Sequence, residues 1–148
     1  MRSLSALAVL VATLIFAAPA GAAVQRLQAS LSGSQETAPG GDPDGTGTAK
    51  LRLNRAERRV CYTIRVRDID GVVAAHIHRG RRGVAGGIAV ELIGSPRSGT
   101  RFTGCTEGVA RRLIRAIVRR PRRFYVNVHT GAYPAGAVRG QLRRPSQS

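Results

Sequence analysis

The stretch "AKLRLNRAERRVCYTIRV", residues 49–66, decides the fold class of this chain. Its first part alternates apolar and polar residues through Leu51 and Leu53, and its last part repeats the alternation from Val60 to Val66. A two-residue period is typical of strands with one buried face. The charged connection "NRAERR" between the two runs is short, so the stretch predicts an antiparallel hairpin.

Short alternating runs of the same kind occur on both sides of this hairpin. They are separated by loops rich in glycine, proline and aspartate, of which "SGSQETAPGGDPDGTGT" is the longest. Further strands are expected near residues 27–31, 73–78, 88–92, 124–129 and 138–142. Short strands with frequent turns predict a mainly β chain that forms an antiparallel β-sandwich or flattened barrel.

One segment, "TEGVARRLIRAIVRRP" at residues 106–121, departs from the β pattern. Its residues Leu113, Ile114 and Ile117 fall on one helical face, which predicts one short amphipathic helix with Thr106 as its N-cap. The other face and the residues after it carry Arg111, Arg112, Arg115, Arg119, Arg120, Arg122 and Arg123. We interpret these arginines as a solvated surface over a β core, with a polyanion or membrane-surface patch as the alternative.

Residues 1–22 have the features of a signal peptide. A positively charged start and an apolar run from Leu4 to Ala18 precede small residues, and cleavage is predicted after Ala22, with Ala23 as the alternative. The apolar run is shorter than the roughly 20 residues that span a bilayer, and no later segment is apolar enough to do so. We therefore expect a secreted or periplasmic protein without a transmembrane segment after signal removal; a retained anchor is the alternative.

The two cysteines, Cys61 and Cys105, both lie in the part that we expect to be exported. An even number of cysteines in an oxidising compartment predicts one disulfide, against the alternative of two buried free thiols. The loop that this bridge would close is long, so chain-entropy arguments assign it about 4 kcal/mol of stabilisation.

The formal net charge is +16, with 23 arginines and a single lysine. It predicts salt-sensitive adhesion to polyanions such as an anionic envelope or extracellular polymer. Sequence-specific recognition of nucleic acid is not expected, because the chain has no Trp and only three Phe and three Tyr to stack on bases. The sequence also lacks a G-x-S-x-G nucleophile motif and a phosphate-binding glycine loop, so we expect no catalysis.

The three histidines are related by strand parity. His76 and His78 share one face of their strand, and His129 shares a face with Asn127 on another strand, in each case opposite the apolar residues. If these strands are neighbours, the polar faces form one cluster. Its members are His76, His78, His129, Asn127, Arg139 and Gln141, with Glu36 within reach from the long loop.

Two interpretations of this cluster remain open. Three imidazoles can hold zinc or copper and leave one coordination position free. In the structural alternative, each imidazole bonds a loop carbonyl or a carboxylate, and the histidines and Arg139 hold loops on the sheet. The structural interpretation is favoured, because Arg139 would repel a divalent cation and no carboxylate near a histidine in sequence offers an outer-shell partner.

Five segments occur in a characteristic order along the chain. They are "LSGSQETAP" (31–39), "VCYTIRV" (60–66), "AAHIHRGRRGVAGG" (74–87), "GC" (104–105) and "FYVNVHTGAYPAGAVRGQL" (124–142), the last being the most specific. Together they resemble the CHRD domain, a module first described in chordin and found alone in many exported bacterial proteins. The resemblance assigns residues 23–142 to a CHRD domain and leaves 143–148 as a disordered tail.

The resemblance implies an immunoglobulin-like β-barrel, distantly similar to copper/zinc superoxide dismutases, with no established enzymatic activity. Those enzymes hold two metals with more histidines and an aspartate, so a dismutase is not expected here. We therefore expect a secreted, non-catalytic CHRD-domain protein that serves as a binding or structural module for an anionic polymer or another protein. One alternative is a zinc- or copper-binding protein, either a redox enzyme or a metal carrier. The other is a cationic envelope-binding protein that acts through the arginine-rich helix.

Overall fold

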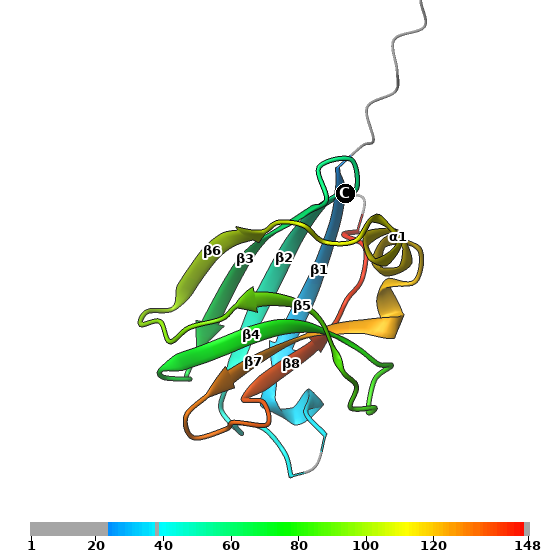
Figure 1. Ribbon diagram of the computed structural model, residues 1–148. Helices are drawn as coiled ribbons and strands as arrows, with labels where there is room; N and C mark the ends of the chain where they lie inside the picture. The colour runs from blue at the N-terminus through cyan, green and yellow to red at the C-terminus, as the bar shows by residue number, and fades with distance from the viewer. Residues whose placement is uncertain (1–23, 38, 147–148) are drawn as a thin grey trace, which may run out of the picture.

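The computed structural model describes residues 24–37 and 39–146, and within them the chain is mainly β, as the sequence predicts. The predicted signal peptide, residues 1–22, lies outside the described residues. The described residues contain eight strands and one α-helix, which Figure 1 labels. The strands are β1 (Gln25–Ser32), β2 (Thr46–Asn54), β3 (Arg59–Arg67), β4 (Val72–Arg79), β5 (Ile88–Ile93), β6 (Arg101–Thr106), β7 (Phe124–Thr130) and β8 (Val138–Gln141). The helices are α1 (Arg111–Arg119) and two short 3-10 helices, η1 (Gly33–Gln35) and η2 (Pro121–Arg123).

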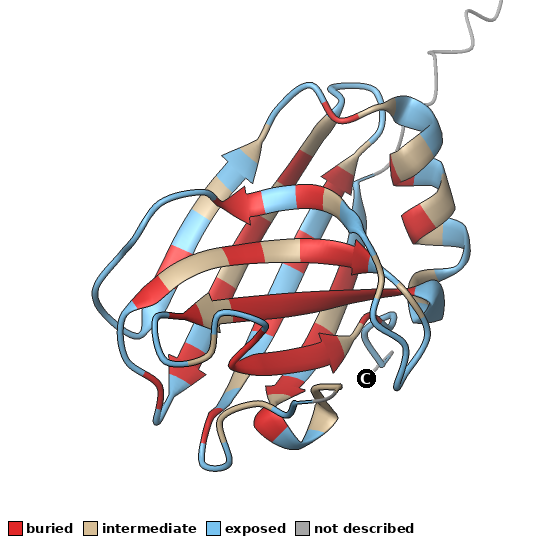
Figure 2. Cartoon of the chain, turned by 60° about the horizontal axis from the view of Figure 1, so that its bottom comes forward, coloured by how far each residue is buried: buried red, intermediate tan, exposed pale blue. Residues whose placement is uncertain are grey.

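The stretch at residues 49–66 forms the antiparallel pair β2–β3, which confirms the predicted hairpin. Leu51 pairs with Tyr62 and Leu53 with Val60, and all four side chains are buried. Their neighbours along each strand point to the other face, which gives the stripes of buried and exposed residues in Figure 2. The two-residue period therefore places one face of this hairpin in the core.

The strands form one antiparallel sheet in the order β5-β4-β7-β8-β1-β2-β3-β6, folded into two layers around a single core. One layer contains β5, β4, β7 and β8, and the other contains β1, β2, β3 and β6 (Figure 1). The layers join where Ser32 of β1 pairs with Arg139 of β8. At the far edge the Thr106 hydroxyl donates to the Glu91 carbonyl, so the sandwich is a nearly closed barrel.

Helix α1 packs on one end of the sandwich through the buried side chains of Ile114 and Ile117 (Figure 1). The predicted N-cap at Thr106 is wrong, because Thr106 still pairs with Val60 in the sheet and the helix begins after Ala110. Sheet pairing holds the Thr106 backbone in an extended conformation. The N-cap is therefore Ala110, four residues after the predicted N-cap. No helix within the described ranges has the length and apolarity that a membrane crossing requires.

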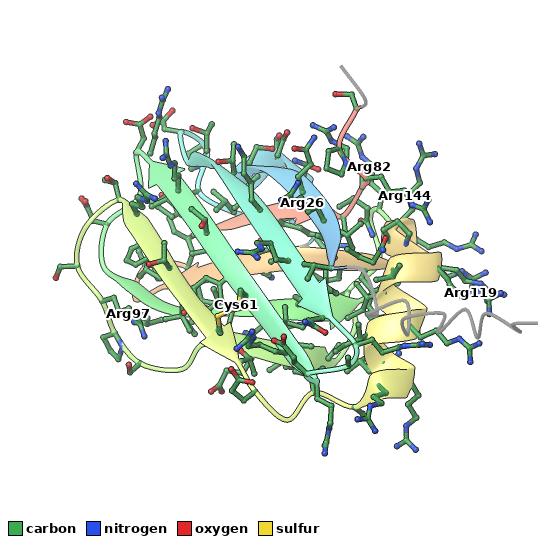
Figure 3. The ribbon with its side chains drawn as sticks, turned by 90° about the horizontal axis from the view of Figure 1, so that it is seen from above. Arg26, Cys61, Arg82, Arg97, Arg119 and Arg144 are labelled. Carbon is green, nitrogen blue, oxygen red and sulfur yellow. A yellow bond between two sulfur atoms is a disulfide. The ribbon has the colours of Figure 1, made fainter. Side chains whose placement is uncertain are left out.

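The predicted disulfide between Cys61 and Cys105 is present in the structure. The two residues are directly opposite each other on β3 and β6, and Cys61 lies on the outer face of the sheet (Figure 3). On β1, one row away from the disulfide, Gln28 exchanges two backbone hydrogen bonds of 2.9 Å with Arg143. Regular pairing thus extends one residue into the segment that the sequence analysis assigned to the tail.

Candidate metal centre

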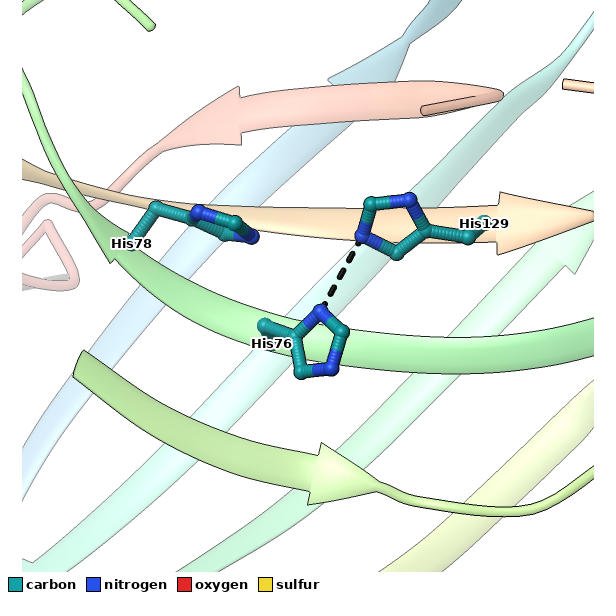
Figure 4. Close-up of side chains that lie close together, drawn as sticks. All are labelled: His76, His78 and His129. Atoms are coloured by element: carbon teal, nitrogen blue, oxygen red, sulfur yellow. Dashed lines mark hydrogen bonds between the residues drawn. The ribbon is translucent and has the colours of Figure 1, made fainter. Parts of the chain in front are cut away.

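The three histidines lie together on the outer face of the β4–β7 pair. These strands are antiparallel neighbours, with His76 opposite Asn127 and His78 opposite Tyr125. His129 is two residues beyond Asn127, so its side chain projects from the same face as the other two (Figure 4). The sequence did not establish that β4 pairs with β7. This pairing brings His76 and His78 of β4 next to Asn127 and His129 of β7.

One ring nitrogen from each histidine lies within 4.8 Å of the others. The closest approach is 3.1 Å, between Nδ1 of His76 and Nε2 of His129, drawn as the dashed line in Figure 4. Tetrahedral zinc with bonds of about 2.05 Å needs its nitrogen ligands about 3.4 Å apart. Closing a separation of 4.8 Å to this spacing requires a shift of about 1.4 Å between the two rings.

Backbone carbonyls determine which nitrogens carry lone pairs. His78 Nδ1 lies 2.8 Å from the Gly86 carbonyl oxygen, and His129 Nδ1 lies 3.0 Å from that of Pro134. A carbonyl only accepts hydrogen bonds, so both Nδ1 atoms donate and both Nε2 atoms are left with lone pairs. His129 Nε2 accepts a hydrogen bond from His76, whereas His78 Nε2 is buried without any partner.

The surroundings keep all three imidazoles neutral. Burial, together with the smaller effects of the neighbouring His129 and His78, lowers the pKa of His76 to about 4. Burial also lowers the pKa of His78 and of His129, although the carbonyls that accept from their Nδ1 atoms act in the opposite direction. Neutral imidazole is the form that ligates metal ions.

A stack of side chains lies behind His78. The Tyr125 ring is nearly parallel to the His78 ring at a centroid distance of 5.0 Å, and the Arg139 guanidinium carbon lies 3.4 Å from the Tyr125 centroid. The Tyr125 hydroxyl also accepts from the backbone N–H of Gly86, the residue whose carbonyl orients His78. Tyr125 was not singled out in the sequence, although it shares strand parity with Asn127 and His129.

Arg139 and Gln141 were predicted to belong to the polar cluster. Their side chains instead donate hydrogen bonds to backbone carbonyls of loops and not to the histidines. The Arg139 guanidinium donates to the carbonyls of Arg81 and Val84, and only 2% of the residue is exposed. The Gln141 amide donates to the carbonyls of Gly80, Arg122 and Phe124. Both residues thus anchor the loop that presents Gly86 to His78, which agrees with the structural interpretation for these two positions.

Glu36 and Asn127 form a second polar group beside the histidines. A Cβ atom on Gly136 would meet Glu36 Oε1 at 2.5 Å and Asn127 Oδ1 at 2.6 Å, so both oxygens face this glycine. Neither oxygen has a hydrogen-bond partner, and both are buried. Burial raises the pKa of Glu36 to about 7, against the lowering effect of Arg139. Glu36 is not among the side chains that could share an ion with the imidazoles.

The orienting groups of this site are backbone carbonyls, which a sequence does not reveal. No carboxylate lies near a histidine in the sequence, but Gly86 and Pro134 supply the orienting contact through their main-chain carbonyls. Gly86 is required there, because any Cβ would collide with the Arg79 carbonyl. The glycine-rich "GVAGG" loop was the one available signal.

The predicted arginine patch lies apart from the histidines. Its seven members on α1 and η2 are all exposed: Arg111, Arg112, Arg115, Arg119, Arg120, Arg122 and Arg123. Figure 3 shows Arg119 projecting from the helix away from the sheet. Arg81, from the loop after β4, joins the C-terminal four of them around one hollow.

The fold and this site define a disulfide-linked β-sandwich domain with a three-histidine cluster on one outer face. The model of the CHRD domain family matches residues 27–142, and the chain belongs to that family. No curated protein and no solved structure matches the chain significantly.

Proposed function

We propose that this chain is an exported CHRD-domain protein that binds one zinc or copper ion through His76, His78 and His129, without catalysing a reaction. The observation that carries the proposal is the buried lone pair of His78 Nε2, which has no hydrogen-bond partner among residues 24–37 and 39–146. A buried polar atom without a hydrogen bond costs about 1–3 kcal/mol, and a metal ion at this position would remove the cost.

The contacts of the other ring nitrogens support the same conclusion. Histidine ligands commonly donate their second ring nitrogen to a carbonyl, which sets the tautomer and the ring orientation. His78 and His129 already have this arrangement with Gly86 and Pro134. His76 is the adaptable member, since moving its proton from Nδ1 to Nε2 would free the nitrogen that faces His129.

The choice of metal follows from the ligand set. Three neutral imidazoles without a thiolate or carboxylate suit zinc and copper rather than calcium or magnesium. The buried Arg139 adds a positive charge near His78, as its effect on the pKa of that residue indicates. This charge opposes a divalent ion more than a monovalent one, and therefore favours copper(I) over zinc where both are present.

Export is the second part of the proposal. The signal-like residues 1–22 and the Cys61–Cys105 bridge both suit an oxidising compartment outside the cytoplasm. An exported protein meets metal ions without the competition of cytoplasmic thiols. Detection of the mature, disulfide-bonded chain outside the cytoplasm would support this part, and a reduced chain that retains residues 1–22 would contradict it.

The direct test is metal binding by tag-free, metal-stripped protein. We expect one equivalent of zinc or copper per chain at micromolar concentration, measured by titration calorimetry and elemental analysis. The double variant His76→Ala, His78→Ala should take up neither ion while it remains folded by circular dichroism. Failure of the unmodified protein to take up either ion would overturn the proposal.

A matched pair of glycine variants tests the orienting carbonyl. Gly86→Ala forces a shift of the loop, because its Cβ would meet the Arg79 carbonyl, whereas Gly87→Ala has open space. We expect metal affinity to fall about 10- to 100-fold in Gly86→Ala, as for the loss of other outer-shell partners, and to stay unchanged in Gly87→Ala. Equal affinities of the two variants would contradict the role assigned to this carbonyl.

A further inference from the structure

The layer that contains β1, β2, β3 and β6 has an outer face on which only basic charges occur. Alternate residues of these strands point away from the core, and none of the four strands contains Asp or Glu. Six exposed cations make up what we call the basic face: Arg26, Lys50, Arg52, Arg65, Arg67 and Arg101. This face is independent of the histidine cluster, which lies on the other layer.

The sheet register places like charges directly opposite one another. Arg26 of β1 pairs with Arg52 of β2, and Arg65 of β3 pairs with Arg101 of β6. Opposed residues have Cβ atoms only about 5 Å apart, and like charges there destabilise a sheet. A solvated surface normally avoids such pairs by interspersing the two signs.

The chain itself does not neutralise these charges. Within residues 24–37 and 39–146, the ion pairs are those of Arg59 with Glu57 and Glu107, at the end of the hairpin. None of the six cations of the basic face takes part in them. The repulsion therefore remains in the folded protein, and an external anion would relieve it.

The six cations occupy four successive rows across the strands of this layer. The row of the disulfide contains Arg26 and Arg52, and the next row contains Lys50 together with Thr63 and Thr103. The third row contains Arg65 and Arg101 together with Thr48, and the fourth contains Arg67. Cys61 and Arg67 are six residues apart on β3, so the cations extend over about 20 Å along the strands.

The surface over the first two of these rows is hollowed. A hollow of about 540 Å³ is lined by Arg26, Lys50 and Arg52 together with Thr63, Thr103 and the disulfide. Figure 3 shows this face, with Arg26 and Cys61 labelled on it. An extended chain could thus place anionic groups against the cations of successive rows while its hydroxyls meet the threonines.

We propose that the basic face binds an acidic polysaccharide through its carboxylate groups. Guanidinium groups pair with carboxylates through two parallel hydrogen bonds, and an extended polymer is needed to reach the cations of all four rows. Single-stranded nucleic acid fits less well, because the aromatic residues of these strands, Tyr62 and Phe102, are buried and cannot stack on bases. A lipid surface fits less well, since the exposed large apolar residues of the described part, Val24, Val84 and Ile88, lie outside these four strands.

The test compares two variants of equal charge. Arg26→Gln, Arg52→Gln, Arg65→Gln removes three positive charges from the basic face, and Arg111→Gln, Arg112→Gln, Arg115→Gln removes three from α1. With polygalacturonate as the probe and neutral dextran as the blank, we expect about tenfold weaker binding for the first variant. The second variant should bind as the unmodified protein does.

Three results would overturn the proposal. Equal losses in the two variants would mean that net charge alone governs binding, and unchanged binding of the first variant would place the polymer elsewhere. Tighter binding of single-stranded DNA or of anionic lipid vesicles than of polygalacturonate, at equal charge concentration, would assign the face to another class of partner. Neutral dextran should not bind in any case.

A stability measurement gives an independent result. The substitution Arg65→Thr removes one of the two like-charge pairs, so at low salt it should raise the melting temperature of the unliganded protein. Polygalacturonate should raise the melting temperature of the unmodified protein more than that of Arg65→Thr. A lower melting temperature for Arg65→Thr without ligand would contradict the assumed repulsion.

Discussion

The two outer faces of the sandwich differ in what covers them. On the β4–β7 face, loops close over the strands, and Asn127 and Arg139 are only 4% and 2% exposed. On the face of β1, β2, β3 and β6, the arginines stand in solvent, as Figure 3 shows for Arg26. Both faces are built from the same alternating strands, so the sequence period alone does not separate them.

The difference shows that loops which bury strand side chains can give them the fixed partners of a binding site. Under a loop, a polar side chain must find a fixed partner, as His78 does with the Gly86 carbonyl, and its pKa moves away from the ordinary value. In solvent the same kind of residue keeps its charge and exchanges partners with water. A covered face therefore favours one specific small ligand, whereas an open basic face favours a long polyanion.

The largest effect is expected from the disulfide on the open face. The double variant Cys61→Ala, Cys105→Ala should lose about 4 kcal/mol of unfolding free energy, because its unfolded chain is no longer constrained. Thr63 and Thr103 form the neighbouring opposed pair on the same two strands, so Thr63→Ala, Thr103→Ala is the control. The control should lose less than about 1 kcal/mol in urea unfolding. Equal losses of unfolding free energy in the two variants would show that the disulfide contributes no more to stability than an ordinary cross-strand pair of side chains.

The next largest effect on stability is expected from replacing the buried Arg139, in comparison with the exposed Arg52. Arg139→Met leaves the carbonyls of Arg81 and Val84 without a donor and removes the contact with Tyr125, which should cost about 2–4 kcal/mol. Arg52→Met on the open face should change stability by less than about 0.5 kcal/mol. Urea unfolding of the two variants measures the difference, and similar values would contradict the contrast between the faces.

A smaller effect is the pH dependence of stability, which we expect to come from His76 and Glu36 on the β4–β7 side of the molecule. The pKa of His76 is about 4 in the folded protein, below its ordinary 6.5, so its contribution to stability is lost as the pH falls from 6.5 through 4. The pKa of Glu36 is about 7, above its ordinary 4.5, so its contribution is complete below pH 4.5 and is lost as the pH rises through 7. In metal-free protein the two trends oppose each other.

Two variants separate these trends. Glu36→Gln should gain stability relative to the unmodified protein as the pH rises from 4.5 to above 7, because it removes the second trend. His76→Gln should gain relative stability as the pH falls from 6.5 to 4. Unfolding curves of metal-free proteins across this range provide the measurement. Curves parallel to that of the unmodified protein would show that neither group is perturbed by burial.

Much of the fold could be predicted from local pattern. The alternation around Leu51 and Val60 predicted the hairpin, and an even cysteine count predicted the bridge. Strand parity also placed His76 with His78, and His129 with Asn127, because side-chain direction in a strand depends only on position along the chain. The start of the helix could not be predicted in this way, since pairing between Thr106 and Val60 prolongs β6 past the change in pattern.

The sequence by itself determined the fold class, the family and the candidate metal ligands, because periodicity, composition and motif order are local properties of the chain. Only the tertiary structure decided that β4 lies beside β7, that loop carbonyls of Gly86 and Pro134 set the lone pairs of His78 and His129, and that arginines face arginines across β1–β2 and β3–β6. These are relations between segments distant in sequence. Main-chain carbonyls have no side-chain signature, and the register of strand pairing is set by packing of the whole core.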